Sequence, residues 1–81
     1  MNEPYNPVMK AMIINVVDNQ IEANDPPITR QTLERLKKSG YSTQQAKEMI
    51  GSVVAENLFV MLKEDKLFDV GEYTRRLNEL G

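Results

Sequence analysis

Residues 42–64 read STQQAKEMIGSVVAENLFVMLKE and predict one long helix over 43–64. Ser42 and Gln45 form a capping box, in which each side chain satisfies a backbone N–H near the start of the helix. Apolar residues then recur at three- and four-residue spacing, which is the pattern of a helix face that packs on a core. They are Ala46, Met49, Ile50, Val53, Val54, Leu58, Met61 and Leu62.

The second half of this helix is apolar on nearly every side, which is typical of a central helix or of an interface. An 81-residue chain has little surface with which to cover both flanks of so long a helix. We therefore expect a second copy or another helical protein to cover part of it. The expected interface residues are Leu58, Phe59, Val60, Met61 and Leu62. Earlier in the helix, the small pair Gly51-Ser52 predicts a close helix crossing.

Capping signals predict three further helices. Asn6-Pro7 opens a helix over about 7–24, and Pro26-Pro27 ends it. A helix over about 29–39 stops at Gly40, the residue type that best tolerates a left-handed C′ position. Asp69 caps the last helix, over about 70–80. The first helix carries a single apolar stripe: Met9, Met12, Ile13, Val16, Val17 and Ile21.

These elements predict an all-α fold, a single small bundle of four helices that forms one domain over residues 1–81. Two polar residues interrupt the apolar stripes, Gln20 in the first helix and Asn57 in the long one. A buried amide costs about 1–3 kcal/mol unless it is paired. Each is therefore expected to have a hydrogen-bond partner if it lies inside the bundle, and a polar interface position is the alternative.

The composition argues against catalysis and against a resident cofactor. The chain contains no cysteine and no histidine, so the commonest general base and the usual zinc and iron ligands are missing. Neither a nucleophile–base pair nor a phosphate-binding glycine-rich loop is recognisable. We expect no catalytic residue, no metal and no cofactor.

The longest apolar run, residues 58–62, is far too short to span a bilayer. The first residues, Met1-Asn2-Glu3-Pro4, lack the basic and apolar regions of a signal peptide. The expectation is a cytoplasmic protein that does not associate with membranes.

An alternative function is DNA binding by a helix-turn-helix unit over residues 29–50. Its basic residues would be Arg30, Arg35, Lys37 and Lys38. They lie on the first helix of the unit, whereas the helix that would read DNA offers Lys47 balanced by Glu48. Since the net charge is −2, nucleic acid is the less favoured partner.

A set of short segments resembles a known family. The matching residues are Asp18-Asn19-Gln20, Asp25-Pro26-Pro27, Thr32-Leu33-Glu34-Arg35-Leu36, Gly40, Ala46, Ile50-Gly51 and Lys66-Leu67-Phe68-Asp69. They are similar to a bacterial family of helical domains of unknown function, with the pattern ENQ…PP…TLERL…G…RHEAxH. The resemblance implies a helical fold and an unassigned role. Where those relatives resemble a His-Glu-x-x-His helix, this chain has Gln44-Gln45-Ala46-Lys47-Glu48, so the resemblance supplies no metal ligand.

Overall fold

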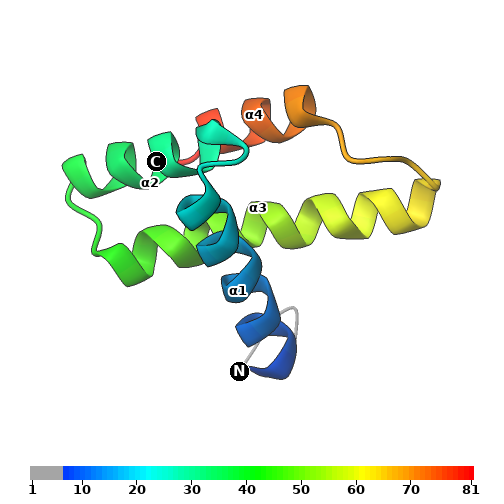
Figure 1. Ribbon diagram of the computed structural model, residues 1–81, viewed down its shortest axis with the longest axis horizontal. Coiled ribbons are helices and arrows are strands. Elements are labelled where there is room, and N and C mark those ends of the chain that lie inside the picture. Colours follow the sequence, from blue (N-terminus) through cyan, green and yellow to red (C-terminus); the bar gives the residue numbers. More distant parts are fainter. Residues whose placement is uncertain (1–6) are drawn as a thin grey trace.

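A computed structural model describes residues 7–81 and folds them into four helices (Figure 1). The helices are α1 (Pro7–Ala23), α2 (Pro27–Lys38), α3 (Thr43–Glu64) and α4 (Val70–Asn78). No strand occurs in this part of the chain. The predicted all-α bundle of four helices is therefore confirmed.

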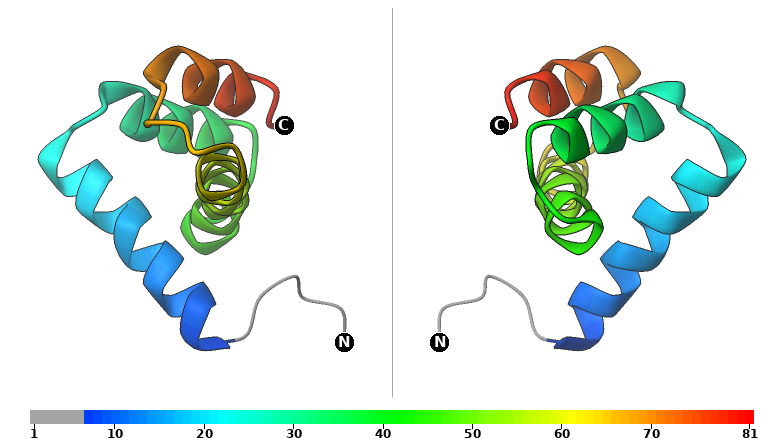
Figure 2. Two further views of the ribbon diagram at one scale, coloured as in Figure 1. Left: turned by 90° about the vertical axis from the view of Figure 1, so that its right-hand side faces the viewer. Right: turned by 90° about the vertical axis from the view of Figure 1, so that its left-hand side faces the viewer.

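The long helix α3 is the element on which the others pack. Helices α2 and α4 lie beside each other along one side of it, and α1 crosses it at a steep angle (Figures 1 and 2). Figure 2 shows α1 leaving the layer of α2 and α4 and running obliquely past α3. This crossing leaves much of the second half of α3 uncovered by α1.

The predicted start signals of the last two helices are confirmed in atomic detail. The Ser42 hydroxyl accepts a hydrogen bond from the backbone N–H of Gln45, and the Gln45 side chain accepts one from the backbone N–H of Ser42. Asp69 caps α4 by accepting from the backbone N–H of Glu72 at 3.2 Å. The predicted cap of α1, Asn6, lies outside the described residues.

The predicted start of α2 at Thr29 is wrong by two residues. The paired prolines end α1, as expected, but Pro27 also occupies the first position of α2. Proline fits there because the first N–H of a helix has no partner within the helix and the ring fixes φ near the helical value. Helix α4 ends at Asn78, two residues before the predicted end.

The core lies where α1, α2 and α4 meet α3. Gly51 allows the closest approach, because a Cβ atom added there would lie 3.2 Å from Ile13 Cγ2 and 3.6 Å from Ile14 Cδ1. The predicted close crossing at Gly51 is thereby confirmed. Lys47 Nζ pairs with Asp18 Oδ1 at 2.8 Å across this crossing. The buried apolar residues are Ile13, Val17, Leu33, Leu36, Ala46, Ile50, Val53, Val54, Tyr73 and Leu77.

A buried polar cluster joins α1, α2 and α4 above this core. Gln20 Oε1 lies 2.7 Å from Thr29 Oγ1 and 2.9 Å from the Tyr73 hydroxyl, and the two hydroxyl oxygens are 3.0 Å apart. Thr29 and Tyr73 each have one hydroxyl proton to donate. At any moment, therefore, only two of the three contacts are hydrogen bonds. The amide oxygen of Gln20 therefore has the hydrogen-bond partner that we expected from the sequence.

Burial raises the pKa of the Tyr73 hydroxyl above its ordinary value of 10.0, and the contact with Thr29 opposes this in part. Because the pKa is higher in the folded than in the unfolded state, the stabilisation is present below pH 10 and is lost as the pH rises through the folded pKa. We expect the melting temperature to fall more steeply above pH 10 for the wild type than for a Tyr73→Phe variant, measured by circular dichroism. Parallel curves for the two proteins would exclude this effect.

Candidate functional site

The main candidate site is the corner between α1 and the second half of α3. On α3, Gly51, Ala55, Leu58 and Leu62 follow one another at spacings of four, three and four residues, so they share one face of the helix. Helix α1 packs on this face at Gly51. Leu58 and Leu62 therefore continue, beyond the crossing, the same face that α1 covers.

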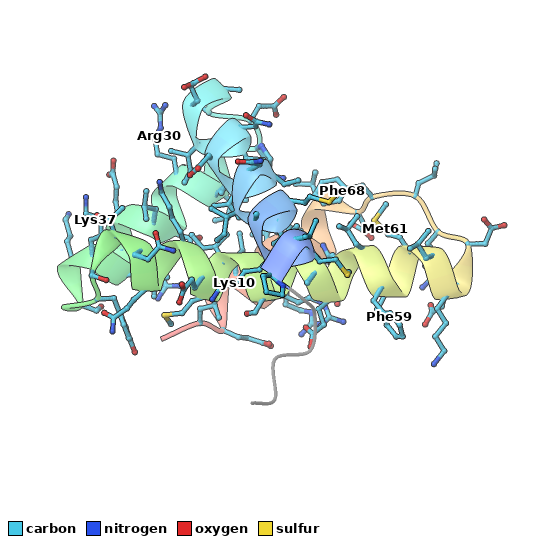
Figure 3. All side chains as sticks on the ribbon, turned by 90° about the horizontal axis from the view of Figure 1, so that it is seen from below. Lys10, Arg30, Lys37, Phe59, Met61 and Phe68 are labelled. Atoms are coloured by element: carbon cyan, nitrogen blue, oxygen red, sulfur yellow. The ribbon has the colours of Figure 1, made fainter. Side chains whose placement is uncertain are left out.

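The opposite wall of this corner is one side of α1. Met9, Met12, Val16 and Gln20 are spaced by three and four residues and share that side. Gln20 meets Tyr73 of α4, which places this side of α1 toward α4 and the second half of α3. Figure 3 shows Phe68 and Met61 on this side of α1. Two apolar helix sides thus converge on one corner.

The corner is open and apolar. Its exposed side chains are Met9 (48%), Met12 (61%), Val16 (37%), Leu58 (44%) and Leu62 (85%), with Phe59 (66%) at the edge. We refer to these six residues as the apolar corner. Exposed apolar patches of more than a few hundred Å² are rare on monomeric proteins and mark binding surfaces.

The five residues predicted as an interface divide between two surfaces. Leu58, Phe59 and Leu62 are exposed, whereas Val60 and Met61 are half-buried and line a cleft beneath residues 65–69. In Figure 3, Phe59 points away from the side of α3 on which Met61 lies. Residues 58–62 therefore line a cleft on one side of α3 and are exposed on the other side.

The stripe predicted for α1 is only partly a core stripe. Ile13 and Val17 are buried and Ile21 is half-buried, but Met9, Met12 and Val16 are exposed. Helix α1 meets α3 with the side that carries Ile13, Ile14 and Val17, so the side that carries Met9, Met12 and Val16 is left open. The sequence did not identify these three residues as exposed. The available signal was their apolar type and helical spacing, which are typical of a helix face that packs against another surface.

The four basic residues of the nucleic-acid alternative are not equally available. Arg30 donates to the Ile21 carbonyl at 2.7 Å, and Arg35 donates to the carbonyls of Leu77 and Leu80 at 2.9 Å each. Both guanidinium groups thus bind backbone carbonyls at or just beyond the C-terminal ends of other helices. Only Lys37 and Lys38 project freely from the surface, and two lysines supply few phosphate contacts.

The polar residues of the predicted family motif lie on the surface. The Gln44 amide donates to Glu48 at 3.1 Å, and Lys10 Nζ lies 3.5 Å from Glu48. The hydrogen bond from Gln44 and the charge of Lys10 lower the pKa of Glu48. Among residues 7–81, no three His, Cys, Asp or Glu side chains gather closely enough to hold a metal ion. None of the helices described over this range is both long and apolar enough to cross a membrane.

Comparison with known proteins adds no assignment. The chain matches no family model, no curated protein and no solved structure. The family resemblance thus stays a prediction.

Proposed function

We propose that this protein is a non-enzymatic cytoplasmic interaction module that forms a homodimer through the apolar corner. The observation that carries the proposal is the convergence of two exposed apolar helix sides. Leu62 is 85% exposed and Met12 is 61% exposed, so neither contributes much to the monomer core. A second copy gives both side chains a partner.

The shape of the corner favours a two-fold arrangement. The second half of α3 extends beyond α1 as an arm (Figure 1), and Leu58 and Leu62 on this arm are exposed. In a two-fold dimer, the α3 arm of each copy packs into the apolar corner of the other copy. The same residues of both copies then form the interface. Such an isologous contact needs a patch that is complementary to itself.

The charges around the apolar corner do not oppose a contact between two copies. None of the six corner side chains is charged, and the tip of the arm carries Lys63, Glu64, Asp65 and Lys66, two of each sign. Two copies therefore bring no net like charge together. Methionines on α1 suit the surface, because their unbranched side chains adapt to an irregular partner.

A dimer interface of ordinary size would take up a modest share of the surface of this chain. A standard interface covers about 800 Å² on each partner, which is roughly one seventh of the 5548 Å² that this chain exposes. The apolar corner would form the centre of such an interface, and the charged tip of α3 its rim.

Light scattering at micromolar concentrations tests the proposal. We expect a mass of 18.6 kDa, twice the 9.3 kDa of one chain, that falls toward 9.3 kDa on dilution. A mass that stays at 9.3 kDa up to about 100 μM, where the free energy of association is weaker than about −5.5 kcal/mol, would contradict it.

A further inference from the structure

A second surface of the protein is a cleft of about 290 Å³ between α3, residues 65–69 and the start of α4. Six polar or charged side chains line it: Asn57, Glu64, Lys66, Asp69, Glu72 and Arg76. It lies on the side of α3 that carries Asn57 and Met61, apart from the face that carries Leu58 and Leu62. The self-association proposed above does not require it.

The charged groups in this cleft already have partners in the protein. Glu64 pairs with Lys66 at 3.1 Å, and Arg76 binds both Glu56 at 2.7 Å and Glu72 at 3.1 Å. The Asp69 carboxylate accepts the hydrogen bond that caps α4. Glu72 also binds Arg75, and this hydrogen bond is the first cause of its lowered pKa. A charged ligand would therefore have to displace an existing ion pair.

Asn57 is the exception. Its residue is only 9% exposed, yet its carboxamide makes no hydrogen bond within residues 7–81. The sequence leads one to expect a partner for this amide, as Gln20 has. Solvent still reaches its amide atoms from the cleft, so water serves them until a ligand takes its place. The unpaired amide lines the cleft, so a ligand there can supply both the acceptor and the donor that it lacks.

We propose that the cleft binds one uncharged residue of a partner peptide, held by its backbone N–H and C=O on the Asn57 carboxamide. The amide of asparagine matches these two groups because it donates through NH₂ and accepts through its oxygen. Val60, Met61 and Leu67 supply an apolar wall for the side chain of the bound residue. The cleft of about 290 Å³ has room for one residue of this kind.

The test uses N-acetyl-leucinamide, which carries two neutral amides and one apolar side chain, in a nuclear magnetic resonance titration of the ¹⁵N-labelled full chain. We expect saturable shifts of the Asn57 side-chain amide and of the Leu67 and Glu72 backbone signals, with a dissociation constant in the millimolar range. N-acetyl-leucine, whose carboxylate would meet the acids of the cleft, is expected to bind at least tenfold more weakly. Equal shifts with propionamide, which has no side chain for the apolar wall, would contradict a peptide site.

Two Asn57 variants and one matched control separate binding from folding. Asn57→Leu is expected to weaken binding at least tenfold, because it removes both the donor and the acceptor of the carboxamide, while circular dichroism should show that the helices are retained. Asn19→Leu, at an exposed position of α1, is the matched control and should leave binding unchanged. Asn57→Asp keeps the shape of the side chain, removes the donor and should also weaken binding. Unchanged binding in both Asn57 variants, or no saturable shift in the wild type, would overturn the proposal.

Discussion

A Met12→Glu, Leu62→Glu double variant is expected to stay folded and to be a monomer of 9.3 kDa at concentrations where the wild type is a dimer. The two substitutions fall on the two walls of the apolar corner. Because the side chains are 61% and 85% exposed, the monomer loses little packing when they are replaced. The two-fold arrangement brings four new carboxylates into one apolar interface, where each loses its hydration.

The size of this effect follows from the central position of the two residues. Truncation of a buried interface anchor commonly costs 2 kcal/mol or more, and each 1.4 kcal/mol changes the dissociation constant about tenfold. We expect the dissociation constant to rise at least about 100-fold. Sedimentation velocity measures the change, and circular dichroism verifies that the helices are retained.

The matched control is a Gln31→Glu, Asn78→Glu double variant. It adds the same two negative charges at exposed positions of α2 and α4, outside the apolar corner. It is expected to dimerise like the wild type. If both double variants dissociated equally, net charge rather than the corner would govern association.

The second large effect is expected at the helix crossing. Gly51→Leu should destabilise the fold by about 3 kcal/mol, near the upper end for overpacking a core. A Cβ atom at this position would already lie 3.2 Å from Ile13 Cγ2, so the further atoms of leucine cannot fit without moving α1. Since a chain of 81 residues is stabilised by roughly 4–12 kcal/mol, a large part of the stability is lost. Urea unfolding measures the change.

Two variants show whether the loss arises from the crossing. Ser52→Leu places the same side chain on the next, exposed residue and should change stability by less than about 0.5 kcal/mol. Gly51→Ala should also have a small effect, because a better helix propensity offsets the shift of Ile13 by a few tenths of an ångström. A Gly51→Leu protein as stable as Ser52→Leu would contradict the observed packing of α1 on α3.

Local signals predicted the helices well, because capping depends on residues that are close in sequence. The capping box of Ser42 and Gln45 and the cap of Asp69 lie where the sequence placed them. Pro27 was harder to interpret, since proline both ends one helix and begins the next. The sequence alone does not decide which of these two roles fixes the boundary.

The candidate site was only half predictable, because helical periodicity defines a face without showing what covers it. Met9, Met12 and Val16 have the spacing of core residues, but α1 meets α3 with another side, which leaves them exposed. Which side meets α3 depends on Gly51 and on the residues that meet it from α1. In the long helix, Leu58 and Leu62 are indeed exposed, while Val60 and Met61 face the cleft.

Long-range polar contacts were not predictable from the sequence. Arg35 and Leu80 are 45 residues apart, and the hydrogen bond between them depends on how α2 and α4 pack. The same holds for Gln20 and Tyr73, which are 53 residues apart. Asn57 drew attention as a polar interruption of an apolar stripe, but only the fold shows that it lines a cleft without a partner.

The most direct test of the proposed dimer is an isotope-filtered nuclear Overhauser experiment on a mixture of ¹³C-labelled and unlabelled chains. Only contacts between different copies give signals in this experiment. We predict cross-peaks from the methyl groups of Met9 and Met12 on one copy to those of Leu58 and Leu62 on the other. A protein of 18.6 kDa whose intermolecular cross-peaks avoid these four residues would contradict the apolar corner as its interface.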